Sequence, residues 1–331
     1  MSPATEGAPP LLQVRDLEVA FRVRGGEVLA SRGVSLEVRA GETLGLVGES
    51  GSGKSVLCRA VLRLLPQPAA QVRVGQVLFD GADLLALPER RMRQVRGTDI
   101  AMVFQNPMTS LSPVWPIGDQ LTEGLRVHRG LSRAAAREQG IALMRATGIP
   151  EPERRYDDHP WQWSGGMLQR AVIAMAMACK PRLLLADEPT TALDVTIQEQ
   201  ILALLADLQE ASGMAMVLVS HDIGVVAETC DRIAVMYAGT VVETGPAAAV
   251  LGNPRHPYTL GLLRSSPGVD RAGRRLDPIP GQPPDLADPA PGCPFAERCA
   301  LASAQCRENP VRLEDRAPGH ASACLFPERM S

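Results

Sequence analysis

The sequence has no long hydrophobic run. Its longest apolar segments, such as AVIAMAMAC at residues 171–179, are far shorter than the roughly 20 residues that a helix needs to span a bilayer. The first residues lack a basic segment followed by an apolar one, so we expect no secretory signal and a short disordered tail over residues 1–10. These two absences indicate a protein that is cytosolic or peripheral on a membrane.

Aromatic residues are also scarce, and positive charge is not in excess. Aromatics make up 3% of the 331 residues, too few for a platform that stacks bases, and the net charge is -3. No nucleic-acid partner is therefore expected. The apolar fraction of 45% is ordinary for a globular protein, and the length allows one large domain with a smaller one.

Short apolar runs alternate with helical segments from residue 11 onwards. Residues 11–21 show strand periodicity, whereas the apolar residues of 54–65 recur at helical spacing. The runs that we interpret as buried strands are residues 42–48, 99–105, 182–187, 215–220 and 232–239. Buried strands separated by helices predict an α/β fold with a mostly parallel central sheet.

The alternation is interrupted in the middle of the chain. Between Gln105 and Trp163 the strands stop, and residues 114–128 and 132–149 have the pattern of helices. This predicts a helical subdomain, at about residues 106–163, inserted into the α/β core.

The last part of the chain has a different composition. Proline, glycine and cysteine accumulate beyond a boundary that we place near residues 253–260, and helix or strand patterning fades. We therefore expect a main domain over residues 11–253, followed by a loop-rich appendage over residues 254–331.

Residues 48–55, GESGSGKS, follow a predicted strand and open a predicted helix, which is the context of a phosphate-binding P-loop. A helix dipole contributes only about 0.3–1 kcal/mol at such a terminus, too little to hold a multiply charged nucleotide. Lys54 is therefore expected to contact the β- and γ-phosphates, and the Ser55 hydroxyl to hold Mg²⁺. The expected nucleotide-binding residues of this loop are Gly48, Glu49, Ser50, Gly51, Ser52, Gly53, Lys54, Ser55 and Val56. The alternative is a Gly/Ser turn that happens to precede Lys-Ser.

Residues 182–190, RLLLADEPT, form an apolar strand that ends in two carboxylates. We expect Asp187 to lie beside the magnesium ion and Glu188 to polarise an attacking water. The alternative is an acidic N-cap for the next helix.

Residues 163–170, WSGGMLQR, predict a second phosphate cradle. Ser164 is a good N-cap, and Gly165 and Gly166 open a helix whose first N–H groups are bare, which is an anion site. Because a nucleotide already has the P-loop, this cradle is expected to serve a nucleotide held by another subunit.

These motifs in this order resemble the ATP-binding-cassette (ABC) ATPases over residues 11–253. The other matching positions are Gln105 in VFQNP, Asp194 in TALDV and His221 in VSHD. The resemblance implies an antiparallel N-terminal β-subdomain beside the core. It also implies a head-to-tail dimer with two ATP molecules sandwiched between P-loop and signature.

The resemblance also implies roles for single residues. Gln105 would sense the γ-phosphate and help hold Mg²⁺, Glu188 would act as general base, and His221 would contact the γ-phosphate. Gln169 would belong to the signature contacts, and Asp194 would signal across the dimer. The adenine-stacking aromatic maps to Phe21, for which a core phenylalanine is the alternative.

The signature departs from the family's commonest form, LSGGQ. Trp163 replaces the leucine and Met167 the glutamine, while Ser-Gly-Gly is intact. Phosphate binding should therefore survive, whereas the contacts of the flanking side chains should differ in strength from those of the common form.

Residues 255–267, RHPYTLGLLRSSP, and the cysteines beyond them resemble one branch of this family, the ATPase subunits of oligopeptide/dipeptide importers, whose relatives also serve nickel and other small solutes. The resemblance implies two transmembrane permeases, an external solute-binding protein, and a place at the cytoplasmic face of the cell (inner) membrane. It favours a second, homologous ATPase chain over a homodimer. It does not name the solute.

Four cysteines lie close together in the appendage, with spacing C-x₅-C-x₆-C-x₁₇-C. In a reducing compartment such a cluster favours a metal over disulfides. Zinc sites usually contain a tight C-x₂₋₄-C pair, which is missing here, whereas a [4Fe–4S] cluster tolerates freer spacing. The branch resemblance implies that cluster, with zinc and free thiols as the alternatives. The ligands would be Cys293, Cys299, Cys306 and Cys324, and their role would be to cross-link a tail that has little core of its own.

Other classes of function remain as rivals. A soluble ABC ATPase acting on DNA would carry a long coiled coil after Gln105, and the segment up to Trp163 lacks sustained heptads. A ribosome-acting one usually has two cassettes, but only one P-loop is present. A regulatory nucleotide sensor would not need every hydrolytic position filled. The sequence therefore favours an ATPase that drives solute uptake.

Overall fold

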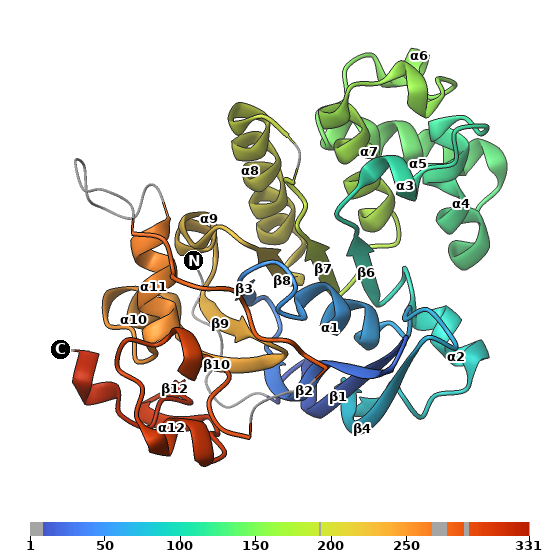
Figure 1. Cartoon of the computed structure of the whole chain (residues 1–331). Coiled ribbons are helices and arrows are strands. Elements are labelled where there is room, and N and C mark those ends of the chain that lie inside the picture. The colour runs from blue at the N-terminus through green and yellow to red at the C-terminus, as the bar shows by residue number, and fades with distance from the viewer. Residues whose placement is uncertain (1–8, 192, 267–276, 288–290, 331) are drawn as a thin grey trace. The chain divides into compact units, whose positions relative to one another are not determined.

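The structure is a computed structural model that describes residues 9–191, 193–266, 277–287 and 291–330 (Figure 1). The predicted disordered tail therefore falls almost entirely outside the described residues. Two compact units make up the chain: unit 1 contains Met1–Ala86 and Leu218–Ser331, and unit 2 contains Leu87–Val217. Among the described residues, no helix is both long and apolar enough to cross a membrane.

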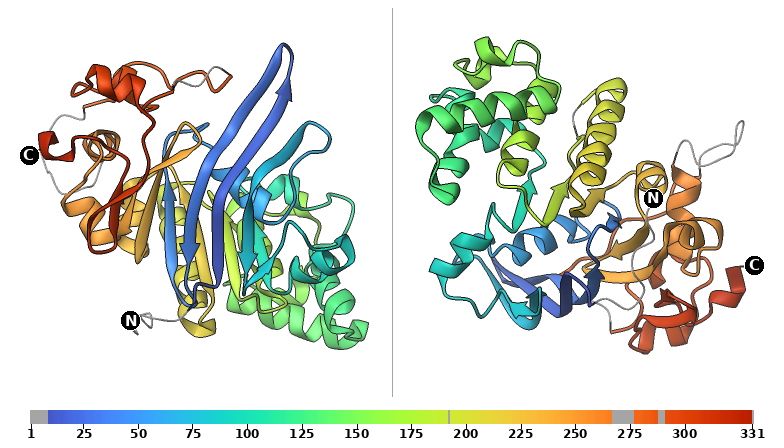
Figure 2. Two further views of the ribbon diagram at one scale, coloured as in Figure 1. Left: turned by 90° about the horizontal axis from the view of Figure 1, so that it is seen from below. Right: turned by 180° about the vertical axis from the view of Figure 1, so that it is seen from behind.

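Unit 1 begins with an antiparallel sheet, as the family resemblance implied. Its strand order is β2-β1-β4-β5, and the left view of Figure 2 shows β1 and β2 as a long hairpin in blue. The strands are β1 (Leu12–Val23), β2 (Gly26–Val38), β4 (Ala70–Phe79) and β5 (Ala82–Asp83). Strand β1 pairs with both neighbours, Leu12 lying opposite Val38 on one side and Phe79 on the other. Its apolar side chains are buried, which is why the strand periodicity could be read from the sequence.

The second sheet contributes β3, β9, β10, β12 and β11 to unit 1. Strands β3 (Thr43–Val47) and β9 (Arg232–Tyr237) are parallel, whereas β10 (Thr240–Pro246) runs antiparallel to β9. All five residues of β3 are buried, so a continuous apolar run is what this position requires. Helix α1 (Lys54–Val61) follows β3, and α9 (Ile223–Thr229), α10 (Ala247–Gly252) and α11 (Pro257–Ser265) complete the unit. The sheet is thus mixed, and its antiparallel part lies towards the end of the chain.

Unit 2 contains the predicted helical subdomain. Its strands β6 (Ile100–Val103) and β7 (Leu183–Asp187) are parallel neighbours. Its helices are α2 (Glu89–Val95), α3 (Pro107–Ser110), α4 (Ile117–Arg129), α5 (Arg133–Ala146), α6 (Pro152–Arg155), α7 (Gly165–Met177) and α8 (Val195–Ser212). The fully buried strand β8 (Ala215–Ser220) contains the boundary between the units. One apolar cluster joins β6 and β7 to α4, α5, α7 and α8, so the inserted helices share a core with the strands.

The appendage is more regular than its composition predicts. It contains helix α12 (Ala304–Glu308) and strands β11 (Glu314–Ala317) and β12 (His320–Ser322). Strand β12 pairs with β10, with Ser322 opposite Glu243, so the end of the chain extends the main sheet. Strand patterning does fade after residue 253, as the sequence indicated, yet two short strands form there. The reason is physical: β11 is mostly exposed and polar, and these two strands are too short to show an alternating pattern.

The appendage also shares an aromatic core with the sheet of unit 1. Tyr237 of β9, Tyr258 of α11 and Phe295 pack with ring centroids 4.5, 5.2 and 5.3 Å apart. The same cluster contains Val47 of β3 and Val235 of β9. Two of the protein's three tyrosines therefore serve to attach the tail.

Candidate functional site

The loop between β3 and α1 curls as a phosphate-binding loop must. Gly51 and Gly53 have φ angles of +81° and +101°, a region that side chains rarely adopt. A Cβ atom at Gly53 would overlap the carbonyl oxygen of Ala30, and one at Gly48 would overlap the carbonyl oxygen of Met236. The backbone of unit 1 therefore requires glycine at both positions.

Lys54, the first residue of α1, is held inside this loop. Its side chain is buried, at 3% exposure, and its ammonium donates to the carbonyl oxygens of Gly48 at 2.7 Å and Glu49 at 2.9 Å. It lies 3.3 Å from the Ser52 hydroxyl, which also accepts. An ammonium group with three donors suits this arrangement, and it places a positive charge at the centre of the curl.

Two further predicted residues lie in unit 1. Phe21 is half-buried near the end of β1, paired with Val28 and Ala70, so its stacking role stays a prediction. His221 directly follows β8 and is exposed. It precedes Asp222, the N-cap of α9, whose carboxylate accepts from the Gly224 amide at 2.8 Å.

Unit 2 brings Gln105 and Glu188 together. Gln105 follows β6 and Glu188 follows β7, and parallel neighbours end at the same edge of a sheet. The Gln105 amide nitrogen donates to Glu188 Oε2 at 2.8 Å, and Thr191 Oγ1 donates to the same oxygen at 2.9 Å. Thr191 was not singled out from the sequence, because a threonine three residues beyond the acidic pair has no signal of its own.

The acidic pair at the end of β7 is not the cap of the next helix. Helix α8 is capped by Asp194, whose carboxylate accepts from the Ile197 amide at 3.0 Å. Asp187 is fully buried at the end of the strand. Glu188 has a left-handed φ of +47°, which costs a non-glycine residue about 1–2 kcal/mol. Such strain clusters at functional sites.

The start of α7 has the predicted shape of an anion cradle. Ser164 is the N-cap, and its hydroxyl accepts from the Met167 amide at 3.4 Å. Ser164 and Gly165 are exposed. A Cβ atom at Gly166 would press on Ile197, but one at Gly165 would make only an ordinary contact 3.5 Å from Leu193 Cδ2. The packing of this chain therefore does not explain the glycine at 165.

The flanking residues of the signature face the core. Trp163 is buried, and its indole N–H donates to Asp158 at 3.1 Å, so the departure from leucine has a structural use. Gln169, expected among the signature contacts, is 1% exposed, and its Nε2 has no hydrogen-bond partner among the described residues. Its side chain lies on the buried face of α7, away from the exposed helix start.

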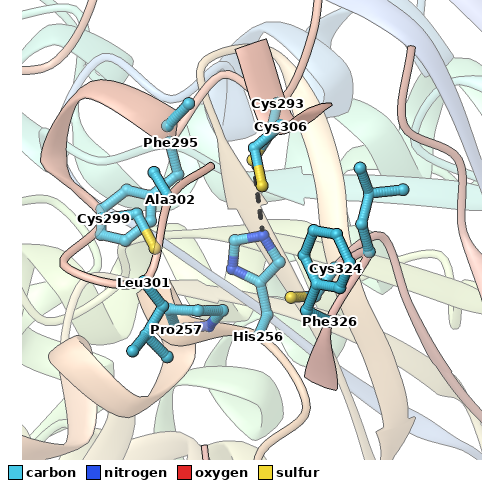
Figure 3. Close-up of a pocket in the computed structure, with 12 residues that line it drawn as sticks. His256, Pro257, Cys293, Phe295, Cys299, Leu301, Ala302, Cys306, Cys324 and Phe326 are labelled. Carbon is cyan, nitrogen blue, oxygen red and sulfur yellow. Dashed lines mark hydrogen bonds between the residues drawn. The ribbon is translucent and has the colours of Figure 1, made fainter. Parts of the chain in front are cut away.

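The four clustered cysteines line one pocket (Figure 3). They are Cys293, Cys299, Cys306 and Cys324, each half-buried and each a free thiol. The cavity of about 20 Å³ has room for roughly one water molecule. Among the described residues, no three side chains of His, Cys, Asp or Glu meet closely enough to hold a metal ion. Four thiol groups are a donor set that suits a soft metal. To bind one metal ion together, however, their sulfur atoms would have to move closer to one another.

His256 is the residue of this pocket that sequence reasoning missed, although RHPYT was noted as a branch marker. Its Nδ1 accepts from the Tyr258 amide at 3.1 Å, which leaves Nε2 facing Cys293 Sγ at 4.0 Å. Burial lowers the pKa of His256 to about 3, so the ring is neutral at physiological pH. Burial also raises the pKa of Cys293 to about 11 and raises the pKa values of Cys299 and Cys324. These thiols keep their protons unless a cation replaces them.

The other three cysteines lie apart from this pocket. Cys58 and Cys179 are buried and Cys230 is half-buried. Burial raises the pKa of Cys230 to about 12, so it behaves as an inert side chain.

The fold and these motifs define an ABC-type ATPase, and comparison with known proteins agrees. Residues 31–191 match the ABC transporter family, and residues 242–306 match the oligopeptide/dipeptide transporter C-terminal region. The chain belongs to the ATP-binding proteins of the oligopeptide/dipeptide ABC transporter family.

Relatives in this family match over nearly the whole chain. A probable peptide ABC transporter ATP-binding protein of Sinorhizobium fredii is 52% identical, with 95% of this chain and 94% of the relative covered. The dipeptide transport ATP-binding protein DppD of Bacillus subtilis is 50% identical, with 96% and 95% covered. The oligopeptide transport ATP-binding protein OppD of the same organism is 51% identical, with 88% and 82% covered.

Solved structures show the same fold. The ATP-binding cassette MJ0796, in a dimeric post-hydrolysis state bound to ADP and Pi, superposes with a TM-score of 0.64 at 28% identity. The superposition covers 71% of this chain and 98% of that one.

Proposed function

We propose that this ATPase powers the uptake of di- or oligopeptides, or of a related small solute, by an ABC importer. The observation that carries the proposal is the identity of about 50% to proteins named for peptide transport, which extends through the tail. These names favour a peptide over nickel or a metallophore. They give no support to a soluble role on DNA or ribosomes.

We assign residues 11–253 to the ATPase domain, with the helical subdomain at about 106–163, and residues 254–331 to the transporter-type extension. The first family match, residues 31–191, lies inside the proposed ATPase domain, and the second, residues 242–306, begins shortly before the proposed boundary and continues into the extension. The assignment is also supported by the change from buried strands to short elements in the tail.

In the proposed reaction Glu188 acts as general base on the attacking water. Glu188 Oε2 already accepts from Gln105 and Thr191, so a water that reaches this oxygen would have to replace one of them, and Gln105 is the exposed one. An exchange at Gln105 would report the state of the site to the rest of unit 2. Ser55, Asp187 and Gln105 carry oxygen donors that suit Mg²⁺, which when bound neutralises phosphate charge. His221 would bind the γ-phosphate, and the P-loop with Lys54 would hold the other phosphates.

The partner ATPase is proposed from the start of α7. Its exposed Ser164 and Gly165 form a cradle in which the glycine is not needed by this chain's own packing. A nucleotide held by a second cassette would need that space, with Asp194 signalling across the same interface. Following the branch resemblance, we propose a different homologous chain in preference to a second copy.

The membrane partners are proposed from exposed apolar side chains on the surface downstream of Gln105. Met108, Val114 and Trp115 are 55%, 72% and 60% exposed, which is costly in water for side chains of this size. Two permease subunits that cover this surface would hold the protein at the cytoplasmic face of the membrane. The external solute-binding protein would act through those permeases.

We further propose that the thiol pocket holds a metal centre, a [4Fe–4S] cluster in preference to zinc. The four sulfur donors in one pocket support it, and a bound centre would cross-link the segments that carry them. The test is anaerobic purification followed by measurement of iron, sulfide and zinc. Cys306→Ser should lose the metal and Cys179→Ala, a matched control in unit 2, should keep it. Protein with neither iron nor zinc would refute the proposal.

The test of the transport function is co-purification. The chain, tagged and expressed at its native level, is recovered from detergent-solubilised membranes and its partners are identified by mass spectrometry. Two polytopic permeases with a second cassette ATPase would support the importer. Recovery only from the soluble fraction, with ribosomal or DNA-bound partners, would overturn it.

A further inference from the structure

The P-loop of unit 1 is held by the C-terminal tail. Glu49, its second residue, donates its backbone N–H to the Tyr258 hydroxyl at 2.8 Å. Its carboxylate accepts two bonds from the Arg298 guanidinium, at 2.6 Å to Oε2 and 3.0 Å to Oε1. A bidentate pair of this kind fixes orientation as well as distance.

Arg298 is itself held in place. Its side chain is 5% exposed, its Nε donates to the Pro280 carbonyl at 2.8 Å, and its Nη1 donates to the Tyr237 hydroxyl at 3.2 Å. It ends the short 3₁₀ helix Ala296–Arg298, directly before Cys299 of the thiol pocket. An arginine with these partners acts as a rigid support for Glu49.

The support reaches the phosphate-binding lysine. Lys54 donates to the carbonyl oxygen of Glu49, the same residue whose N–H and carboxylate are bound by the tail. Glu49 is therefore fixed on one side by Tyr258 and Arg298 and on the other by Lys54. Among the described residues, the hydrogen bonds to the Glu49 carboxylate come from Arg298. Without these bonds the Glu49 side chain could rotate, and the loop would lose this support.

We propose that Arg298 is a positioning residue for ATP binding, which holds the P-loop in its nucleotide-accepting curl through Glu49. The tail is then part of the ATP site as well as a domain that follows it. The inference rests on the proposed function in one respect, that the P-loop binds ATP. Neither Arg298 nor Tyr258 belongs to the P-loop, signature or acidic motifs, and the pairing joins residues 249 positions apart.

The experiment measures binding of a fluorescent ATP analogue and thermal unfolding on the full-length protein. Arg298→Ala and Glu49→Gln should each raise the Kd roughly tenfold, the effect of losing a charge-assisted pair. The double variant should bind no more weakly than the weaker single variant, because both substitutions break one link. Arg307→Ala is the matched control, since this tail arginine pairs with exposed Glu297 at 3.0 Å, and its Kd should be unchanged.

A merely structural arginine would give a different result. It would lower the unfolding temperature while the folded fraction kept the wild-type Kd, and its effect would add to that of Glu49→Gln; either outcome overturns the proposal. If Arg298→Ala does not fold, Arg298→Lys takes its place, because it keeps the positive charge but cannot form the two-bond pair with Glu49. ATP binding that survives Lys54→Ala, with Arg298 and Glu49 unchanged, would instead refute the P-loop assignment, so the two failures are distinct.

Discussion

Two glycine-rich segments open helices in this protein, one before α1 in unit 1 and one before α7 in unit 2. Before α1, Gly48 and Gly53 are enforced by backbone atoms of their own unit, and the lysine is already bound inside the curl. Before α7, Gly165 is exposed and has room for a side chain. The backbone of unit 1 thus fixes the shape of the first segment, whereas packing among the described residues does not explain the glycine in the second, for which we proposed a partner's nucleotide.

The same contrast extends to the acidic motif. Lys54 is buried among fixed carbonyl oxygens, but Glu188 is half-buried, strained and bonded to the exposed Gln105. Of these two residues, the proposed phosphate-binding lysine thus lies in unit 1 and the proposed general base lies in unit 2. Substitutions can separate these two tasks.

The largest effect is expected at Glu188. Replacing it by Gln removes the proton acceptor but keeps the amide able to accept from Thr191, so turnover should fall by about 10²–10⁴. The Kd for ATP should stay near the wild-type value because the proposed role of Glu188 is to activate the water and not to bind the nucleotide. Single-turnover hydrolysis and ATP-analogue binding measure the two quantities. Near-normal turnover would show that Glu188 is not the base.

The next largest effect is expected at Gly53. Replacement by Ala places a Cβ against the Ala30 carbonyl at a φ of +101°, and the loop must open to accept it. ATP binding should weaken roughly 10- to 100-fold, by the arithmetic that 1.4 kcal/mol is a factor of ten. Gly51→Ala is the comparison, since its φ is also positive but no atom lies near its Cβ position. If the Gly53 variant bound ATP as tightly as the wild type, the backbone of unit 1 would not be what fixes the shape of the P-loop.

At Gly165 the comparison predicts opposite signs for stability and activity. Alanine fits there and should stabilise the protein by about 0.4–1 kcal/mol, because it restricts the unfolded chain, so thermal unfolding should shift upwards or not at all. Turnover in the assembled transporter should nevertheless fall about tenfold, because the added methyl occupies the space proposed for the partner's nucleotide. A variant that is as active as wild type in the assembly would remove the argument for a trans cradle. The isolated chain provides the control, since its ATP affinity should not change.

How far the sequence could predict these features depends on how far apart in the chain the contacting residues lie. The P-loop, the acidic strand end and the signature are local patterns, and the structure places each at a strand or helix end as predicted. The ion pair between Arg298 and Glu49 and the pairing of β12 with β10 join segments that are distant in the chain. These segments carry no hydrophobic periodicity that would predict the contacts. The four cysteines could be grouped because they are close in sequence, but His256 beside them could not. The sequence therefore indicates chemistry well where the chemistry is local.

The smallest effect is expected at Thr191, which tests how the Glu188 carboxylate is held in position. Thr191→Val keeps the shape of the side chain but removes the 2.9 Å bond to Glu188 Oε2, while the bond from Gln105 to that oxygen is kept. A single hydrogen bond of this type contributes about 0.5–1.5 kcal/mol, so turnover should fall about two- to tenfold with KM for ATP unchanged. Thr190→Val is the matched control, because the bonds of Thr190 to Leu193 and Gln198 use its backbone carbonyl. A rise in KM without a fall in turnover would mean that Thr191 acts on binding, and the division of tasks between the two units would then be wrong.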